Sequence, residues 1–134
     1  MKDQKKFNDL EELLEDKNVL FARKELMLLR KSLDLDPDYL YLMSKLLLLD
    51  NRPYLSIDAA ILSIFFDTQD TFLVKKNFTK SSDTTRKKKR LLLIELFKLI
   101  SNKTLETKIQ EIEDDKALID HLFSLMPGLT PKKI

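Results

Sequence analysis

Short polar breaks divide this chain at regular intervals. One series of breaks falls near residues 34–37, 67–70 and 101–104, and a second series falls between them, near residues 17, 51, 82 and 114. The spacing within each series is roughly 31 to 34 residues, which is the length of a helix–turn–helix unit. One such unit cannot bury its own apolar face, so the spacing predicts units that stack on one another.

The composition favours helices between these breaks. The 134 residues are 43% apolar and 34% charged, with one glycine, four prolines and no tryptophan. A chain rich in leucine, lysine and glutamate and poor in turn-forming residues is typical of an all-helical protein. We therefore predict an all-α fold, with two-helix repeats stacked as a short right-handed solenoid or packed as a compact multi-helix bundle. The length suits a single domain over residues 1–134, with a frayed arm at 1–6 and a tail at 127–134.

Residues 36–66 form the clearest unit. Asp36 is a good N-cap and Pro37 suits the first helical position, so a helix is expected to begin there and to stop at 50–53. A second helix is expected to begin at Ser56, and its apolar residues go almost all the way round, so other elements must cover it on several sides. The segment 71–79 is predicted as helical, although its β-branched residues also suit a strand.

The junction Leu35-Asp36-Pro37-Asp38-Tyr39 and the length of the unit resemble a tetratricopeptide repeat. In that family the second helix often ends in an acidic residue and a proline before the next repeat begins, and Ala59 lies where the family favours a small residue. The resemblance covers the whole chain by its period and this junction by residue type, and it implies a protein-binding role. Other two-helix solenoids and a compact bundle stay open.

Catalytic chemistry has few candidates. The chain has no cysteine, and His121 is its only histidine. Asp115 and Asp120 lie near it in the sequence, and Ser124 follows by three residues, but a partly exposed histidine is the expected role. The only glycine, Gly128, is expected to end the last helix instead of forming a phosphate loop. We therefore expect no enzyme and no cofactor.

A calcium loop is also not expected. Asp34, Asp36 and Asp38 alternate as calcium ligands do, but Tyr39 stands where the glycine is required and Lys45 stands where the bidentate glutamate is required. Turn formation and helix capping explain these acidic residues, and no metal site is predicted.

The strongest anomaly is the basic run from Arg86 to Arg90 at the start of a predicted helix, where the helix dipole favours anions. The whole chain carries a net charge of +2, yet residues 1–70 hold 10 Lys/Arg against 14 Asp/Glu and residues 71–134 hold 14 against 8. The run could contact nucleic-acid phosphates, an anionic lipid surface or an acidic protein, serve as a nuclear import signal, or remain a solvated loop.

These observations predict a non-enzymatic adaptor domain that presents a helical groove to a protein partner, either acidic or carrying apolar anchors. Nucleic-acid binding through the basic run is one alternative, and self-assembly through the apolar last helix is another. With no apolar segment long enough to span a membrane and no apolar N-terminal signal, an intracellular, cytoplasmic protein is expected, or a nuclear one in a eukaryote. The residues predicted to bind a partner are Tyr41, Lys45, Lys75, Lys76, Arg86, Lys87, Lys88, Lys89 and Arg90.

Overall fold

The computed structural model describes residues 4–125, and within this range the chain forms eight α-helices and no β-strand. The all-α prediction is confirmed for this range. Residues 4–6, expected in a frayed arm, form the first turn of a helix, whereas residues 1–3, the tail at 127–134 and the expected cap at Gly128 lie outside the described residues. The helices are α1 (Gln4–Glu15), α2 (Val19–Leu33), α3 (Pro37–Leu49), α4 (Pro53–Asp67), α5 (Asp70–Lys76), α6 (Asp83–Leu99), α7 (Lys103–Glu111) and α8 (Asp115–Leu125).

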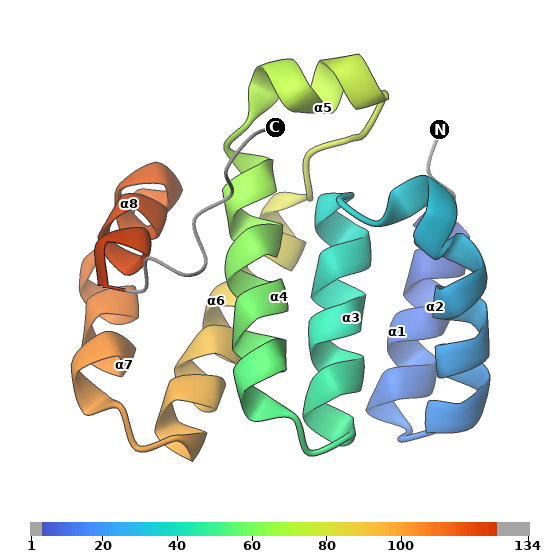
Figure 1. The fold of residues 1–134 in the computed structure, drawn as a ribbon, viewed down its shortest axis with the longest axis horizontal. Coiled ribbons are helices and arrows are strands. Elements are labelled where there is room, and N and C mark those ends of the chain that lie inside the picture. Colours follow the sequence, from blue (N-terminus) through green and yellow to red (C-terminus); the bar gives the residue numbers. More distant parts are fainter. Residues whose placement is uncertain (1–3, 126–134) are drawn as a thin grey trace.

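Most of the helices lie side by side in one row (Figure 1). The pair α1 and α2 is at one end of the row, α3 and α4 are in the middle, and α7 and α8 are at the other end. Helix α4 contacts α3, α5, α6 and α8, as its apolar sequence predicts. Its side chains Ile57, Ile61 and Ile64 are almost completely buried. One apolar core therefore runs the length of the row, from Phe7 in α1 to Leu122 in α8.

The helix starts follow local rules, with one correction. Asp36 accepts a hydrogen bond from the backbone N–H of Tyr39 at 3.0 Å, with Pro37 in the first position of α3, as expected. The next helix, however, begins at Pro53, because proline is equally suited to the first position of a helix and loses no hydrogen bond there. Ser56 is therefore inside α4, and the prediction that it would be an N-cap was wrong.

Ser56 instead joins α4 to α3. Its hydroxyl donates to the carbonyl of Ser44 at 2.7 Å, and the hydroxyl of Ser44 donates to the carbonyl of Ser56 at 2.7 Å. Both serines are fully buried, and this reciprocal pair satisfies polar groups that burial would otherwise penalise. The small serines also let the two helices approach closely.

Four helices end on a residue with left-handed backbone geometry, although none of these residues is glycine. After α1, the backbone N–H of Lys17 donates to Leu14 at 3.0 Å and that of Asn18 donates to Leu13 at 2.8 Å, which is the Schellman pattern of helix termination. The same pattern follows α3, α5 and α6. Left-handed geometry costs a residue with a Cβ atom about 1–2 kcal/mol. The residues are Lys17 (φ 59°), Asn51 (φ 61°), Asn77 (φ 57°) and Ser101 (φ 59°).

The segment 71–79 contains a short helix, α5, and not a strand. Phe72 packs on Phe66 of α4 with ring centroids 4.9 Å apart, and Phe78 packs on Phe72 at 6.2 Å. Figure 1 shows α5 lying across the end of α4. Because α5 is displaced in this way, α6 packs directly against α4, and the third expected helix pair differs from the first two.

Candidate functional site

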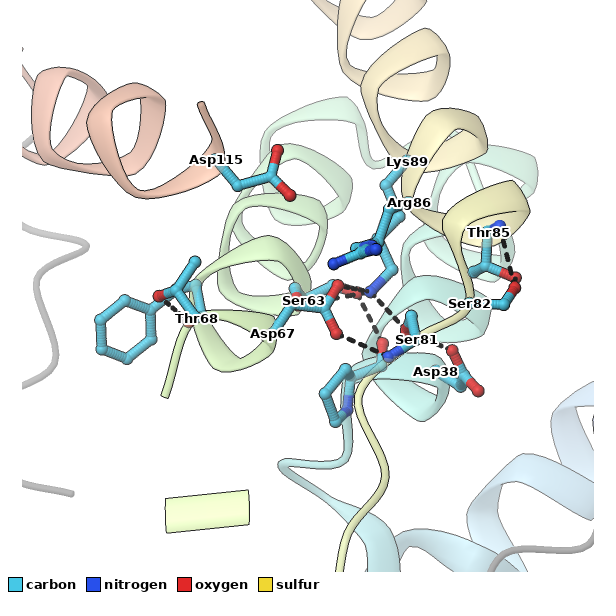
Figure 2. Close-up of polar contacts among 12 residues, drawn as sticks. Asp38, Ser63, Asp67, Thr68, Ser81, Ser82, Thr85, Arg86, Lys89 and Asp115 are labelled. Carbon is cyan, nitrogen blue, oxygen red and sulfur yellow. Dashed lines mark hydrogen bonds and ion pairs between the residues drawn. The ribbon is translucent and has the colours of Figure 1, made fainter. Parts of the chain in front are cut away.

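Lys89, the fourth residue of the basic run, lies in the interior of the protein. Its side chain is fully buried, and its Nζ atom donates to Asp67 Oδ2 at 2.6 Å, to Ser81 Oγ at 2.8 Å and to the carbonyl of Ser63 at 3.4 Å. Figure 2 shows these groups converging between α4 and α6. The prediction that Lys89 contacts a partner was wrong, because all of its surface is covered by the protein itself.

The groups around Lys89 form a connected polar network. The backbone N–H of Ser81 donates to Asp67 Oδ1 at 2.9 Å, while the Ser81 hydroxyl donates to Asp38 Oδ1. The Ser63 hydroxyl donates to the carbonyl of Pro37 at 2.5 Å. A serine beside a lysine can serve as a nucleophile and its base. Here, however, both residues are buried, the lysine faces a carboxylate and the serine proton is directed at Asp38, so the arrangement is suited to holding α3, α4 and α6 together.

Arg90, the last residue of the basic run, binds the end of α7. Its guanidinium donates to Asp115 Oδ1 at 2.6 and 2.9 Å and to the backbone carbonyls of Ile112 and Glu113, each at 2.7 Å. A further bond reaches the carbonyl of Ile109 at 3.1 Å. Carbonyls at the end of a helix have no partner within the helix, and a guanidinium satisfies several of them at once. Arg90 therefore caps the C-terminus of α7.

The remaining cations of the run differ in exposure. Lys88 pairs with Glu11 at 3.2 Å, and Arg86 pairs with Asp83 in the first turn of α6. The helix begins at Asp83, with Ser82 as its N-cap, so the cations lie after the first turn, where the opposing helix dipole is weaker. Among the described residues, Lys87 is exposed and has no hydrogen-bond or ion-pair partner. The five cations therefore do not form one continuous basic surface.

Tyr41 is also inside the protein. It is 4% exposed and its hydroxyl donates to Glu11 Oε2 at 2.9 Å. Burial, reinforced by the Glu11 carboxylate, raises the pKa of Tyr41 above its ordinary value. The prediction of Tyr41 as a partner-binding residue was wrong for the same reason as for Lys89. Lys45 is half-buried, pairs with Glu15 and lies over the Tyr41 ring, 5.4 Å from its centroid.

Lys75 and Lys76 are exposed in the last turn of α5. The structure does not bring them together with Lys45, which lies in the C-terminal half of α3. The residues predicted from the sequence thus belong to several separate places on the molecule.

A polar cleft of about 380 Å³ adjoins Arg86. Its lining includes three cations and five carboxylates. The cleft therefore lacks the excess of positive charge that would attract a phosphate ligand. The charged residues of the lining are Lys80, Arg86, Lys116, Asp67, Asp70, Glu113, Asp114 and Asp115.

An apolar groove lies elsewhere, between α4, the turn from α6 to α7 and the end of α8. Its volume is about 420 Å³, which is within the range of ligand-binding pockets. At its edges Tyr54 is 66% exposed and Leu125 is 53% exposed, which is unusual for side chains of this size. The lining residues are Tyr54, Ile57, Asp58, Phe97, Ile100, Asn102, Thr104, Leu105 and Leu125.

Asp58 is the one charged residue in the groove lining. It is half-buried and has no hydrogen-bond or ion-pair partner in residues 4–125. Burial raises the pKa of Asp58, because the apolar surroundings disfavour its charged form. The sequence reasoning missed this residue, although an acidic residue in the middle of the mostly apolar helix 53–67 was a usable signal.

Most of the apolar side chains of α8 pack against the rest of the chain. Leu118, Ile119 and Leu122 are buried, and Phe123 packs on Phe65 with ring centroids 5.4 Å apart. Self-assembly through α8 would therefore depend mainly on Leu125. On the same helix, Ser124 Oγ donates to the backbone carbonyl of His121 at 2.6 Å and not to its ring.

Residues 4–125 contain no helix long and apolar enough to cross a membrane. In the same range, no group of three or more potential ligand side chains is arranged to hold a metal ion.

Comparisons with known proteins do not assign the chain to a family. No protein-family model, curated protein or solved structure gives a significant match to this chain.

Proposed function

We propose that this chain is a non-enzymatic protein-interaction domain whose apolar groove binds a segment of a partner protein. The observation that carries this proposal is Asp58, a carboxylate that has no partner among residues 4–125 and lies in a groove that is otherwise mostly apolar. Burying a charge is costly unless the charge is paired, so a ligand that brings a cation recovers this cost. The expected ligand therefore places a lysine or arginine beside a large apolar side chain.

The edges of the groove support the same class of ligand. Tyr54 offers a large and rigid contact surface, and tyrosine is enriched among the residues that dominate binding energies. Leu125 of α8 adds a second exposed apolar side chain to the lining. The row of helices and the tetratricopeptide-like period of about 33 residues also favour protein binding.

The test is a selection from a random peptide library on the immobilised full-length chain. We expect the enriched peptides to combine a basic residue with a large apolar residue. Tyr54→Ser is expected to lower their affinity about tenfold, and Asp58→Asn by up to about fivefold. The matched control is Asp120→Asn, which removes an exposed carboxylate of α8 outside the groove and is expected to leave binding unchanged.

The pH dependence gives a second readout. Because the Asp58 carboxylate must be charged to attract a cation, binding is expected to weaken as the pH falls through the raised pKa of Asp58. If the selected peptides bind the Tyr54→Ser and Asp58→Asn variants as tightly as the wild type, the groove is not the binding site and the proposal is wrong.

Nucleic-acid binding through Arg86–Arg90 is the weaker candidate, because the ion pairs and carbonyl contacts of this run occupy four of its five cations. It predicts binding to single-stranded DNA that weakens steeply with salt and is reduced by Lys87→Glu. A cytoplasmic location is part of the main proposal, and microscopy of the tagged chain tests it.

A further inference from the structure

The outer face of α2 carries four large apolar side chains that are exposed. Leu20 is 83% exposed, Leu28 is 69% exposed, Phe21 is 52% exposed and Met27 is 49% exposed. Single exposed apolar residues are ordinary, but several on one helix face form a patch that marks an interaction site. Helix α2 lies at the end of the row (Figure 1), so no helix beyond it in the described chain covers this face.

Two lysines lie within this patch. At 100° per residue, the order around the helix is Met27, Leu20, Lys31, Lys24, Leu28, Phe21. The lysines therefore occupy the centre of the apolar face and not its margins. Both are exposed, and neither has an ion-pair partner in the described part of the chain.

Two of the other charged residues of α2, Arg23 and Glu25, form ion pairs within the protein. The Arg23 guanidinium binds both carboxylate oxygens of Asp50, at 2.6 and 2.7 Å, and Glu25 pairs with Lys6 at 3.4 Å. The exposed face itself contains no acidic residue. It thus combines apolar surface with positive charge that the described residues do not balance by ion pairs.

We propose that this face of α2 binds an acidic amphipathic helix of a partner protein. A helix with carboxylates along the centre of its apolar face would pair with Lys24 and Lys31 while its apolar side chains cover the four exposed ones of α2. This surface is distinct from the groove at Asp58, and the proposal does not depend on that groove.

The central position of the lysines separates this partner from two others. A helix that inserts into a lipid surface needs an uninterrupted apolar face with its cations on the polar side, where they meet the headgroups, whereas cations at the centre would be driven toward the acyl chains. A second copy of α2 would oppose lysine with lysine, and like charges in contact are unfavourable.

The test uses two synthetic amphipathic helical peptides that differ only at the centre of their leucine-rich face, which is glutamate in one and lysine in the other. Fluorescence anisotropy with the full-length chain is expected to show preferential binding of the glutamate peptide. Each lysine contributes about 1.5- to 5-fold, and Leu28→Ser lowers the affinity about tenfold. The double variant Lys24→Glu/Lys31→Glu is expected to reverse the preference, so that the lysine peptide binds better.

The matched control is Lys103→Glu/Lys116→Glu, which changes two exposed lysines of α7 and α8 and is expected to leave the preference unchanged. Circular dichroism checks that each variant is folded, which is expected because all changed side chains are exposed. Asp58→Asn should also have no effect, which keeps this result separate from that of the groove.

Three results would overturn the proposal. One is a failure of the charge preference: the two peptides bind equally well, or the variant Lys24→Glu/Lys31→Glu still prefers the glutamate peptide. A second is cosedimentation with phosphatidylserine vesicles that Leu28→Ser abolishes, which assigns the face to a membrane. The third is concentration-dependent self-association in sedimentation that the same variant abolishes, which assigns it to a second copy of the chain.

Discussion

Replacing Lys89 by methionine tests the interior ion pair most directly. Methionine has nearly the same length and fills the same space, so the substitution removes the charge and its hydrogen bonds with little change in packing. Within residues 4–125, the carboxylate of Asp67, which is fully buried, then keeps the backbone N–H of Ser81 as its remaining donor, at 2.9 Å. Breaking a buried ion pair by removing one partner costs about 3–5 kcal/mol, and we expect the free energy of unfolding to fall by this amount.

This loss is a large part of the stability of a domain this size, which is about 5–15 kcal/mol. Urea unfolding followed by far-ultraviolet circular dichroism measures it, with Lys87→Met as the matched control. Because Lys87 is exposed, its replacement is expected to change the free energy of unfolding by less than about 0.5 kcal/mol.

A double variant isolates the electrostatic part. In Lys89→Met/Asp67→Asn the asparagine oxygen can still accept from Ser81, but no buried charge is left without a partner. We expect this variant to be more stable than Lys89→Met alone. If Lys89→Met costs less than about 1 kcal/mol, or if the double variant is no more stable than the single one, the buried pair does not hold α4 and α6 together.

Three further substitutions test other local features. Arg90→Met is expected to cost about 1.5–3 kcal/mol in urea unfolding, and hydrogen exchange should show the backbone around Ile112 opening more often, while unchanged exchange there would contradict the capping role. Lys17→Gly should raise the free energy of unfolding by about 1 kcal/mol, since glycine adopts left-handed geometry without strain, and a loss of stability would argue against that geometry. The Asp58→Asn variant is expected to be more stable than the wild type at neutral pH. Because the pKa of Asp58 is raised in the folded state, the free energy of unfolding of the wild type falls as the pH rises from the ordinary pKa of 3.8 through the raised pKa. A variant with the same stability profile against pH as the wild type would refute this.

The helices and their ends could be predicted because their signals are local. Asp36 and Pro37 fix the start of α3 whatever the rest of the chain does, and the polar breaks stop the helices near the expected residues. The start of α4 was misplaced because Pro53 and Ser56 both suit a helix start, and the burial of Ser56 against α3 depends on the tertiary structure.

The site residues were harder, because their roles depend on partners that are distant in the sequence. The helical period did carry a signal: counting back four residues from the buried Leu93 places Lys89 on the same face of α6. Its partner Asp67 lies 22 residues away, across α5, and no local pattern links the two. The groove around Asp58 likewise needs three elements to meet, so a sequence alone could show only the isolated carboxylate.

The buried network also limits how this row of helices could be cut or extended. In simple helical arrays each unit contacts only its neighbours, so repeats can be removed or duplicated with small effects. Here one set of hydrogen bonds joins Asp38 of α3, Asp67 of α4 and Lys89 of α6, across a boundary at which the sequence period would divide the chain. Ending the chain between α5 and α6 would leave the carboxylate of Asp67 without its cation. The two halves of this protein are therefore expected to unfold in one transition and not to survive as separate modules.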